Sequence, residues 1–338
     1  AREGSVSTNI ETLVGAVKDF PSLANLTLCT DDREPEDLLI QGHMNYVVYR
    51  AIQAGLSPVQ AITCGTLNVA RELGLRNLGA VAPGWGADLQ IVPDIREPKA
   101  RAVFFGGKLV AENGELVVPL PVRNFAQEHR NTVNMKVPDM DALRIKATGE
   151  RARIRIVVYD SPQSSFTRIV EEEVPVKDGF LDLSSDPDLM FAAVINRHGR
   201  GNLAVAVVRG IGAREGAVAS TVAHDSHNLA IVYDRPENAL VAIKTLSDSG
   251  GGHCAVRNGT VTGHLPLPIF GLLSPLPCGP LVRQVNAMKE ALRSLGVDTK
   301  NPVMRIVSIT LPVIPEGKIT DLGIVDVNAQ KIVPLFVE

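Results

Sequence analysis

The stretch LTLCTDDR at residues 26–33 places two adjacent carboxylates directly after a short apolar run. An apolar run of this kind, over residues 26–29, predicts a short buried strand. Parallel strands of barrel enzymes carry catalytic groups at their C-terminal ends, so Asp31 is a candidate metal ligand and proton acceptor. The alternative is structural, with Asp31 or Asp32 capping the next helix or starting a turn. This stretch alone leaves both interpretations open.

The residues around this stretch predict an alternation of strands and helices. Apolar residues recur at helical spacing over residues 6–20 and again over residues 38–52. Ser57 and Pro58 fit the N-cap and the first position of a further helix, and residues 68–73 predict another short one. This alternation is typical of an α/β domain, here cut off on its N-terminal side.

A change in composition at residue 79 marks a small β unit. Short apolar runs over residues 79–118 flank hairpin turns at Gly106-Gly107 and Asn113-Gly114. Residues 119–140 carry prolines without a periodic pattern, which predicts a linker.

From about residue 141 the pattern predicts a mixed α/β region with layered sheet and helices. Alternating residues 151–159 predict a strand with one solvated face, and residues 236–249 predict a helix that runs into a triple glycine. We also expect a short helix over residues 188–196 and a late strand over residues 306–311. The triple glycine is interpreted as a helix C-cap and not as a phosphate loop, because it lacks the surrounding motif of such loops.

The composition excludes several classes of function. A net charge of −3 gives no electrostatic footprint for nucleic acid, and no run of apolar residues is long enough to predict a membrane span. The cysteines are widely spaced, which predicts reduced thiols of a cytoplasmic protein and neither disulfides nor a zinc site. They are Cys29, Cys64, Cys254 and Cys278.

A second group of polar residues lies at residues 224–228, with the sequence HDSHN, between two apolar runs. In an extended strand, His224 and Ser226 would point one way and Asp225 and His227 the other. This composition suits metal ligation or Ser–His chemistry, whereas the structural alternative is a polar turn that caps the next strand. By contrast, we interpret the lone His43 as a surface or packing histidine.

Several pieces of the chain, in order, resemble metal-dependent amidohydrolases and more narrowly the adenine deaminase family. The pieces are REGS at 2–5, TDDR at 30–33, GAVAPG at 79–84 with AD at 87–88, HDSHN at 224–228, and LPLPI at 265–269 with GLLS at 271–274.

The resemblance implies a fold class and a domain division. We expect an α/β chain made of the C-terminal end of a (β/α)8 barrel at residues 1–78, part of a small β-sandwich at 79–120, and a C-terminal mixed α+β domain at 130–338. The activity implied is hydrolysis of adenine to hypoxanthine and ammonia by a hydroxide bound to two divalent metal ions, manganese or iron, with zinc as a third candidate.

The resemblance also implies roles for particular residues. Asp31 would end the eighth barrel strand, bind metal and shuttle a proton, while Asp32 would lie behind it or cap the loop. His224, Asp225, Ser226 and His227 would shape the substrate site or hold a domain interface. The remaining metal ligands would lie in an N-terminal part of the same enzyme, and the assembly is expected to be a homo-oligomer.

Two other functions fit the same sequence. The chain could be a non-catalytic C-terminal module that binds a partner or stabilises an oligomer, because two barrel units cannot bury their faces alone. It could also belong to an amidohydrolase that acts on another cyclic amide or purine.

Overall fold

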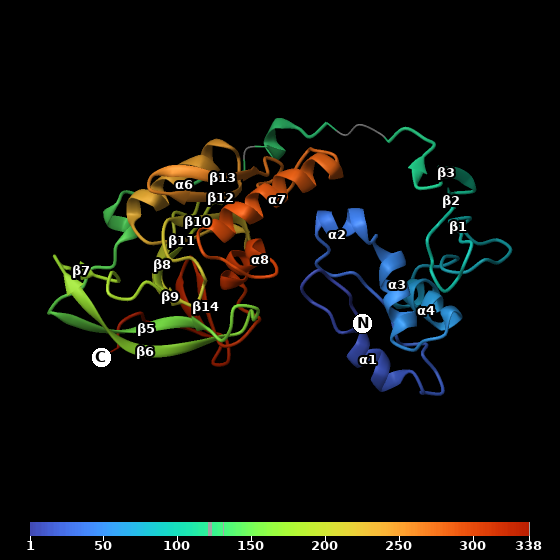
Figure 1. Ribbon diagram of the computed structural model, residues 1–338, viewed down its shortest axis with the longest axis horizontal. Helices are drawn as coiled ribbons and strands as arrows, with labels where there is room; N and C mark the ends of the chain where they lie inside the picture. Colours follow the sequence, from blue (N-terminus) through green and yellow to red (C-terminus); the bar gives the residue numbers. More distant parts are fainter. Residues whose placement is uncertain (121–123, 131, 338) are drawn as a thin grey trace. The chain divides into compact units, whose positions relative to one another are not determined.

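The structure is a computed structural model that describes residues 1–120, 124–130 and 132–337. The chain divides into two compact units, Ala1–Arg123 and Asn124–Glu338, which are described separately (Figure 1). Within the described residues, no helix is both long enough and apolar enough to cross a membrane.

The first unit is built on short helices around a small aliphatic core. They are α1 (Ile10–Val17), α2 (Pro35–Ile40), α3 (Met44–Gln53), α4 (Pro58–Gly65) and α5 (Leu67–Glu72). The core joins α1, α3 and α4 to Leu28 of the apolar run, which is 2% exposed. The predicted cap of α4 is confirmed, because the Gln60 amide donates to the Ser57 hydroxyl and the Ser57 amide donates to the Gln60 side chain.

Two expectations for this unit are wrong in detail. The helix expected over residues 38–52 is two helices, because Gly42 adopts a φ of 100° and ends α2 in the left-handed conformation. In the run expected to be a strand over residues 26–29, only Leu28 is buried, and among the described residues the run forms a single bridge, a parallel one between Cys29 and Arg2. The run therefore lacks the repeated ladder of hydrogen bonds that defines a regular strand.

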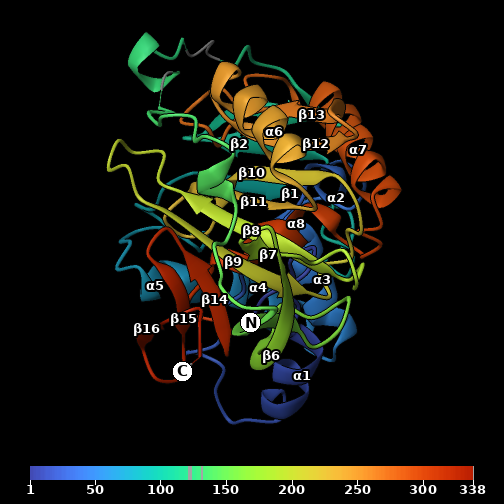
Figure 2. The same ribbon diagram turned by 90° about the vertical axis from the view of Figure 1, so that its left-hand side faces the viewer.

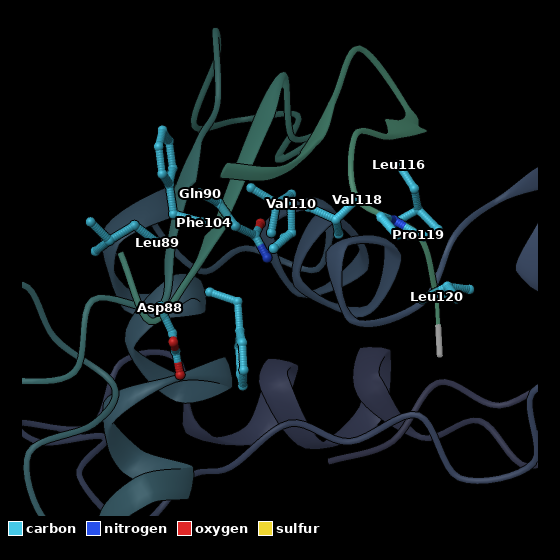
Figure 3. A pocket seen from close by; sticks show the side chains of 11 residues that line it. Asp88, Leu89, Gln90, Phe104, Val110, Leu116, Val118, Pro119 and Leu120 are labelled. Atoms are coloured by element: carbon cyan, nitrogen blue, oxygen red, sulfur yellow. The ribbon is translucent and has the colours of Figure 1, made fainter. Parts of the chain in front are cut away.

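The small β unit is confirmed as an antiparallel sheet with hairpin turns at both predicted positions. Its strands, in spatial order, are β1 (Leu89–Ile91), β2 (Ala102–Phe105), β3 (Lys108–Glu112) and β4 (Glu115–Leu116). Against this sheet lies a hollow of about 440 Å³ with a largely apolar lining (Figure 3). Phe105 and Leu120, which line it, are more than half exposed.

The second unit is dominated by a large sheet with the strand order β13-β12-β10-β11-β8-β9-β5-β6-β7 (Figure 2). β5 and β9 run parallel and the other neighbours are antiparallel. The strands are β5 (Arg151–Tyr159), β6 (Thr167–Lys177), β7 (Phe180–Leu181), β8 (Leu189–Ile195), β9 (Leu203–Arg209), β10 (Ala217–Ala223), β11 (Asn228–Tyr233), β12 (Gly252–Arg257) and β13 (Thr260–Pro266).

Separate apolar clusters cover the two faces of this sheet. Helix α6 (Pro236–Asp248) packs on one face, over β10, β11 and β12. Helix α7 (Cys278–Ser294), helix α8 (Pro302–Val307) and the small sheet that begins with β14 (Gly317–Thr320) pack on the other face. That sheet continues with β15 (Gly323–Asp326) and β16 (Lys331–Val333), and 3-10 turns lie at Gln127–His129, Asp141–Leu143 and Ser308–Thr310.

Burial on both faces explains an error in the expected secondary structure. Residues 188–196 were expected to be helical but contain β8, whose residues are all buried and alternate between the two clusters. A strand that is covered on both sides has a continuous run of apolar residues. It therefore lacks the alternation of apolar and polar residues that identifies a strand in a sequence.

The strand expected over residues 306–311 is also wrong. These residues end α8 and form a 3-10 turn. The pair Asn301-Pro302 favours a helix here. The Asn301 side chain accepts a hydrogen bond from the Met304 amide, and Pro302 takes the first helical position.

Lys318 on β14 is a buried cation whose amino group donates to the carbonyl of Ser165 at 2.7 Å. Burial, with a further contribution from the nearby Arg305, lowers the pKa of Lys318 from 10.5 to about 8. Between these two pH values the unfolded chain binds more protons than the folded one, so folding stability rises with pH across this window.

We therefore expect Lys318→Met to remove this pH dependence. Relative to the variant, the wild type should gain about 3 kcal/mol of unfolding free energy between about pH 7 and about pH 10.5. Urea unfolding followed by far-ultraviolet circular dichroism would measure the difference at each pH. The exposed Lys331→Met is the control, and a constant difference between wild type and Lys318→Met would contradict the prediction.

Candidate functional site

Asp31 lies two residues after Cys29, the end of the apolar run, which forms the bridge to Arg2. Its backbone is left-handed, with a φ of 57°, and its carboxylate accepts a hydrogen bond from the Arg2 guanidinium at 2.5 Å. The Asp31 side chain is 34% exposed. This carboxylate is therefore held in one direction and remains accessible to a ligand.

Asp32 has a different environment, although it is the next residue. Its carboxylate accepts hydrogen bonds from the backbone amides of Val6, at 3.2 Å, and Ser7, at 3.1 Å. The N-cap position of α2 belongs to Glu34, so the helix-capping alternative is wrong for both aspartates. Asp32 instead caps the turn that follows residues 2–5.

A second layer of contacts supports this turn. The Ser5 hydroxyl donates to Asp37 and accepts from the Glu34 amide at 2.8 Å. The buried carboxylate of Glu3 accepts from Arg50 of α3 at 3.0 Å. Hydrogen bonds from Arg50 to Glu11 and to Glu3 raise the pKa of Arg50, which keeps this link between segments charged.

Sequence patterns alone do not predict these contacts. Residues 2–5 enter the sequence analysis only through the family resemblance, and Arg50 belongs to no motif. Since their partners lie 32 to 47 residues away along the chain, periodicity and local motifs carry no signal for them.

The described residues do not complete a metal site by themselves. None of their His, Cys, Asp and Glu side chains come together in a group of three or more that could hold an ion. His43 is exposed at the N-cap position of α3, which agrees with its interpretation as a surface histidine. Asp31 is thus a single candidate ligand, whereas a hydrolytic metal needs several protein ligands.

Residues 224–227 form the turn between β10 and β11. The rings of His224 and His227 meet edge to face with their centroids 5.6 Å apart, while Asp225 and Ser226 are exposed. The prediction that His224 and His227 point in opposite directions is therefore wrong. It assumed an extended strand, but the register shifts in β10 and His227 adopts a left-handed φ of 51°.

A buried arginine holds this turn to two other segments of the second unit. The Arg197 side chain, which is 2% exposed, donates to the carbonyls of His227, Thr132 and Phe270. Burial and the nearby charges of His224 and Arg197 lower the pKa of His227, so its imidazole is neutral at pH 7. The sequence analysis missed Arg197, which follows a buried strand and has no local motif.

The turn also contains polar atoms that lack a partner among the described residues. They are Nδ1 of His227 and Oδ1 of Asn228, both shielded from solvent. An unpaired buried polar atom costs free energy and is uncommon in native proteins. Asp31 and Asp32 belong to the first unit and this turn to the second.

Comparison with known proteins identifies both units. Residues 2–110 match the amidohydrolase family, and residues 164–331 match the adenine deaminase C-terminal domain. The chain is 40% identical over 337 residues to adenine deaminase 2 of Carboxydothermus hydrogenoformans, covering 99% of this chain and 58% of that protein. It is 38% identical to the adenine deaminases of Desulfatibacillum aliphaticivorans, over 99% of the chain, and Methanothrix thermoacetophila, over 100%. The chain spans 58% of the length of each of these relatives.

Proposed function

We propose that this chain, which belongs to the adenine deaminase family of amidohydrolases, is the C-terminal part of an enzyme that hydrolyses adenine to hypoxanthine and ammonia. The observation that carries the proposal is Asp31, an accessible carboxylate held by Arg2 just after the short segment that bridges Arg2 and buries Leu28. A carboxylate in this position can accept a proton from the attacking water and deliver it to the departing amine. Adenine and the N-terminal part of the same enzyme are then the partners of this chain.

Metal binding would require more ligands than the described residues bring together. The family implies a hydroxide activated by divalent metal, and we propose manganese or iron, with zinc as a third candidate. Carboxylate oxygen is a suitable ligand for manganese. Because the described residues offer Asp31 without companion ligands, we assign no metal-dependent step to this chain alone.

The proposal includes a domain division. Residues 1–78 would be the last elements of a (β/α)8 barrel, residues 79–120 part of a β-sandwich, and residues 130–338 the C-terminal domain. The apolar hollow on the sheet β1–β4 supports the second assignment, because a sheet face lined by exposed Phe105 and Leu120 gains free energy when a second layer covers it.

The turn at residues 224–227 is proposed to contribute to the substrate site or to a domain interface. Its support is chemical. His224 and His227 lie together, His227 is neutral at pH 7, and the adjacent Asp225 and Ser226 are accessible. Neutral imidazole and hydroxyl groups can hydrogen-bond the edge of a purine.

The proposal predicts that activity appears only when the barrel is completed. The chain would be co-expressed with the N-terminal part of an adenine deaminase relative, with manganese or iron supplied. We expect the assembled protein to convert adenine to hypoxanthine, measured by ultraviolet absorbance and ammonia release, and the chain alone to be inactive. A metal-loaded assembly that leaves adenine intact would contradict the proposal. Turnover of other cyclic amides in place of adenine would identify a different substrate.

A further inference from the structure

The segment of residues 1–7 and the segment of residues 28–32 are joined by backbone hydrogen bonds at Cys29 and at Asp32. The Cys29 amide donates to Ala1 at 2.9 Å, and the Glu3 amide donates to Cys29 at 3.2 Å. The Ser5 amide then donates to the carbonyl of Asp32 at 3.0 Å. The two segments therefore behave as one piece, in which the position of each depends on the other.

Asp31 has a left-handed backbone within this piece, with a φ of 57°. This conformation costs most non-glycine residues about 1 to 2 kcal/mol, although aspartate adopts it more readily than most. Such a conformation persists only where its surroundings fix it. The Arg2 ion pair is exposed and cannot hold the backbone alone, since exposed ion pairs contribute about 1 kcal/mol or less.

The neighbour that can fix this backbone is Asp32. Its carboxylate binds two backbone amides, those of Val6 and Ser7, and its carbonyl binds a third, that of Ser5. Hydrogen bonds to a charged acceptor are stronger than those between neutral groups. The side chain and the main chain of Asp32 are thus both tied to the opposite segment.

Gly4 leaves the space that the Asp32 carboxylate occupies. A Cβ atom placed on Gly4 would lie 1.7 Å from Oδ1 of Asp32, so any side chain there would expel the carboxylate. Gly4 does not have a left-handed φ, which means that its backbone would accept alanine. The glycine is therefore required by the close approach of Asp32.

We propose that Asp32 is the positioning residue of Asp31, and that its carboxylate does so by sitting over Gly4 and binding the amides of Val6 and Ser7. This inference rests on the proposed function, in which Asp31 handles the proton. The two adjacent carboxylates then have different roles. Asp31 handles the proton, while Asp32 holds the backbone that positions Asp31.

Paired substitutions test the proposal in the assembled enzyme. Asp32→Ala and Gly4→Ala should each lower kcat for adenine about 100-fold with little change in KM, because a displaced catalytic group costs about that factor. The kcat of the double variant should be no lower than that of the more impaired single variant, since both substitutions remove the Asp32 carboxylate from the same position over Gly4. Asp32→Asn, which keeps one acceptor oxygen, should retain intermediate activity. Full activity of Asp32→Ala, or effects of Asp32→Ala and Gly4→Ala that multiply, would overturn the proposal.

A structural measurement on the chain alone separates this inference from the proposed function. Crystal structures or amide hydrogen exchange of Asp32→Ala should show the Val6 and Ser7 amides released and Asp31 turned away from Arg2. Asp94→Ala is the matched control, an exposed aspartate that accepts the Arg96 amide at 2.9 Å in its own turn. If Asp31 keeps its position in Asp32→Ala, the positioning role is wrong, whether or not the wild-type assembly deaminates adenine.

Discussion

Asp31→Asn is expected to lower kcat of the assembled enzyme about 1,000-fold or more while leaving the chain folded. Asparagine matches the shape of aspartate and its oxygen can still accept the hydrogen bond from Arg2, which lies at 2.5 Å in the wild type. It has no carboxylate to receive a proton and is a much weaker metal ligand. The substitution therefore removes the proton-accepting carboxylate and keeps the side-chain shape and the hydrogen bond from Arg2.

Two measurements make the Asp31→Asn experiment decisive. Steady-state turnover of adenine gives the loss in kcat, and the circular dichroism spectrum with the thermal unfolding temperature shows that the fold is retained. Asp94→Asn is the control for loss of a negative charge on the same unit, because Asp94 accepts hydrogen bonds from Arg96 in its own local turn. An active Asp31→Asn enzyme would exclude Asp31 as the proton carrier.

Gly252→Ala is expected to destabilise the second unit by about 4 kcal/mol or more, which places it among the most severe single substitutions. Gly252 has a φ of 134°, and a Cβ atom there would lie 2.0 Å from the carbonyl oxygen of Leu265. That oxygen belongs to the backbone of β13, paired in register with β12. The clash cannot be relieved by turning a side chain.

The β12–β13 hairpin contains its own control for the Gly252→Ala experiment. Gly259 also has a positive φ, 74°, but nothing lies within 4 Å of the position that a Cβ would take. Gly259→Ala should therefore cost only the conformational term, about 1 to 2 kcal/mol. Urea unfolding monitored by far-ultraviolet circular dichroism would compare the stabilities of the two variants. Equal losses of unfolding free energy would show that backbone strain alone, and not the close approach of Leu265, accounts for the cost of Gly252→Ala.

Local pattern predicted much of the secondary structure because the relevant physics is local. The N-cap at Ser57, the turn at Asn113-Gly114 and the helix over residues 236–249 all follow from interactions between residues a few positions apart. Likewise, Gly250 follows the C-cap residue Ser249 of α6 with a φ of 76°, which agrees with the interpretation of the triple glycine as a helix C-cap. Its neighbours across the sheet, however, could not be named from sequence.

The errors arose where burial or backbone geometry overrides pattern. Residues 188–196 lost their strand signature because both faces of β8 are covered. The region around residues 224–227 was treated as extended, whereas a register shift and a left-handed His227 fold it into a turn that pairs the two histidines.

The sequence by itself determined the family resemblance, the position of Asp31 at the end of an apolar run, and the suspicion that one of two adjacent carboxylates is structural. The resemblance implies that this one is Asp32, and only the tertiary structure shows the contacts that hold it. Asp32 binds amides 25 and 26 residues away, over a glycine that leaves room for it, while Asp31 stays accessible beside Arg2. The two residues are chemically identical, so their roles are set by non-local contacts that exist only after the chain has folded.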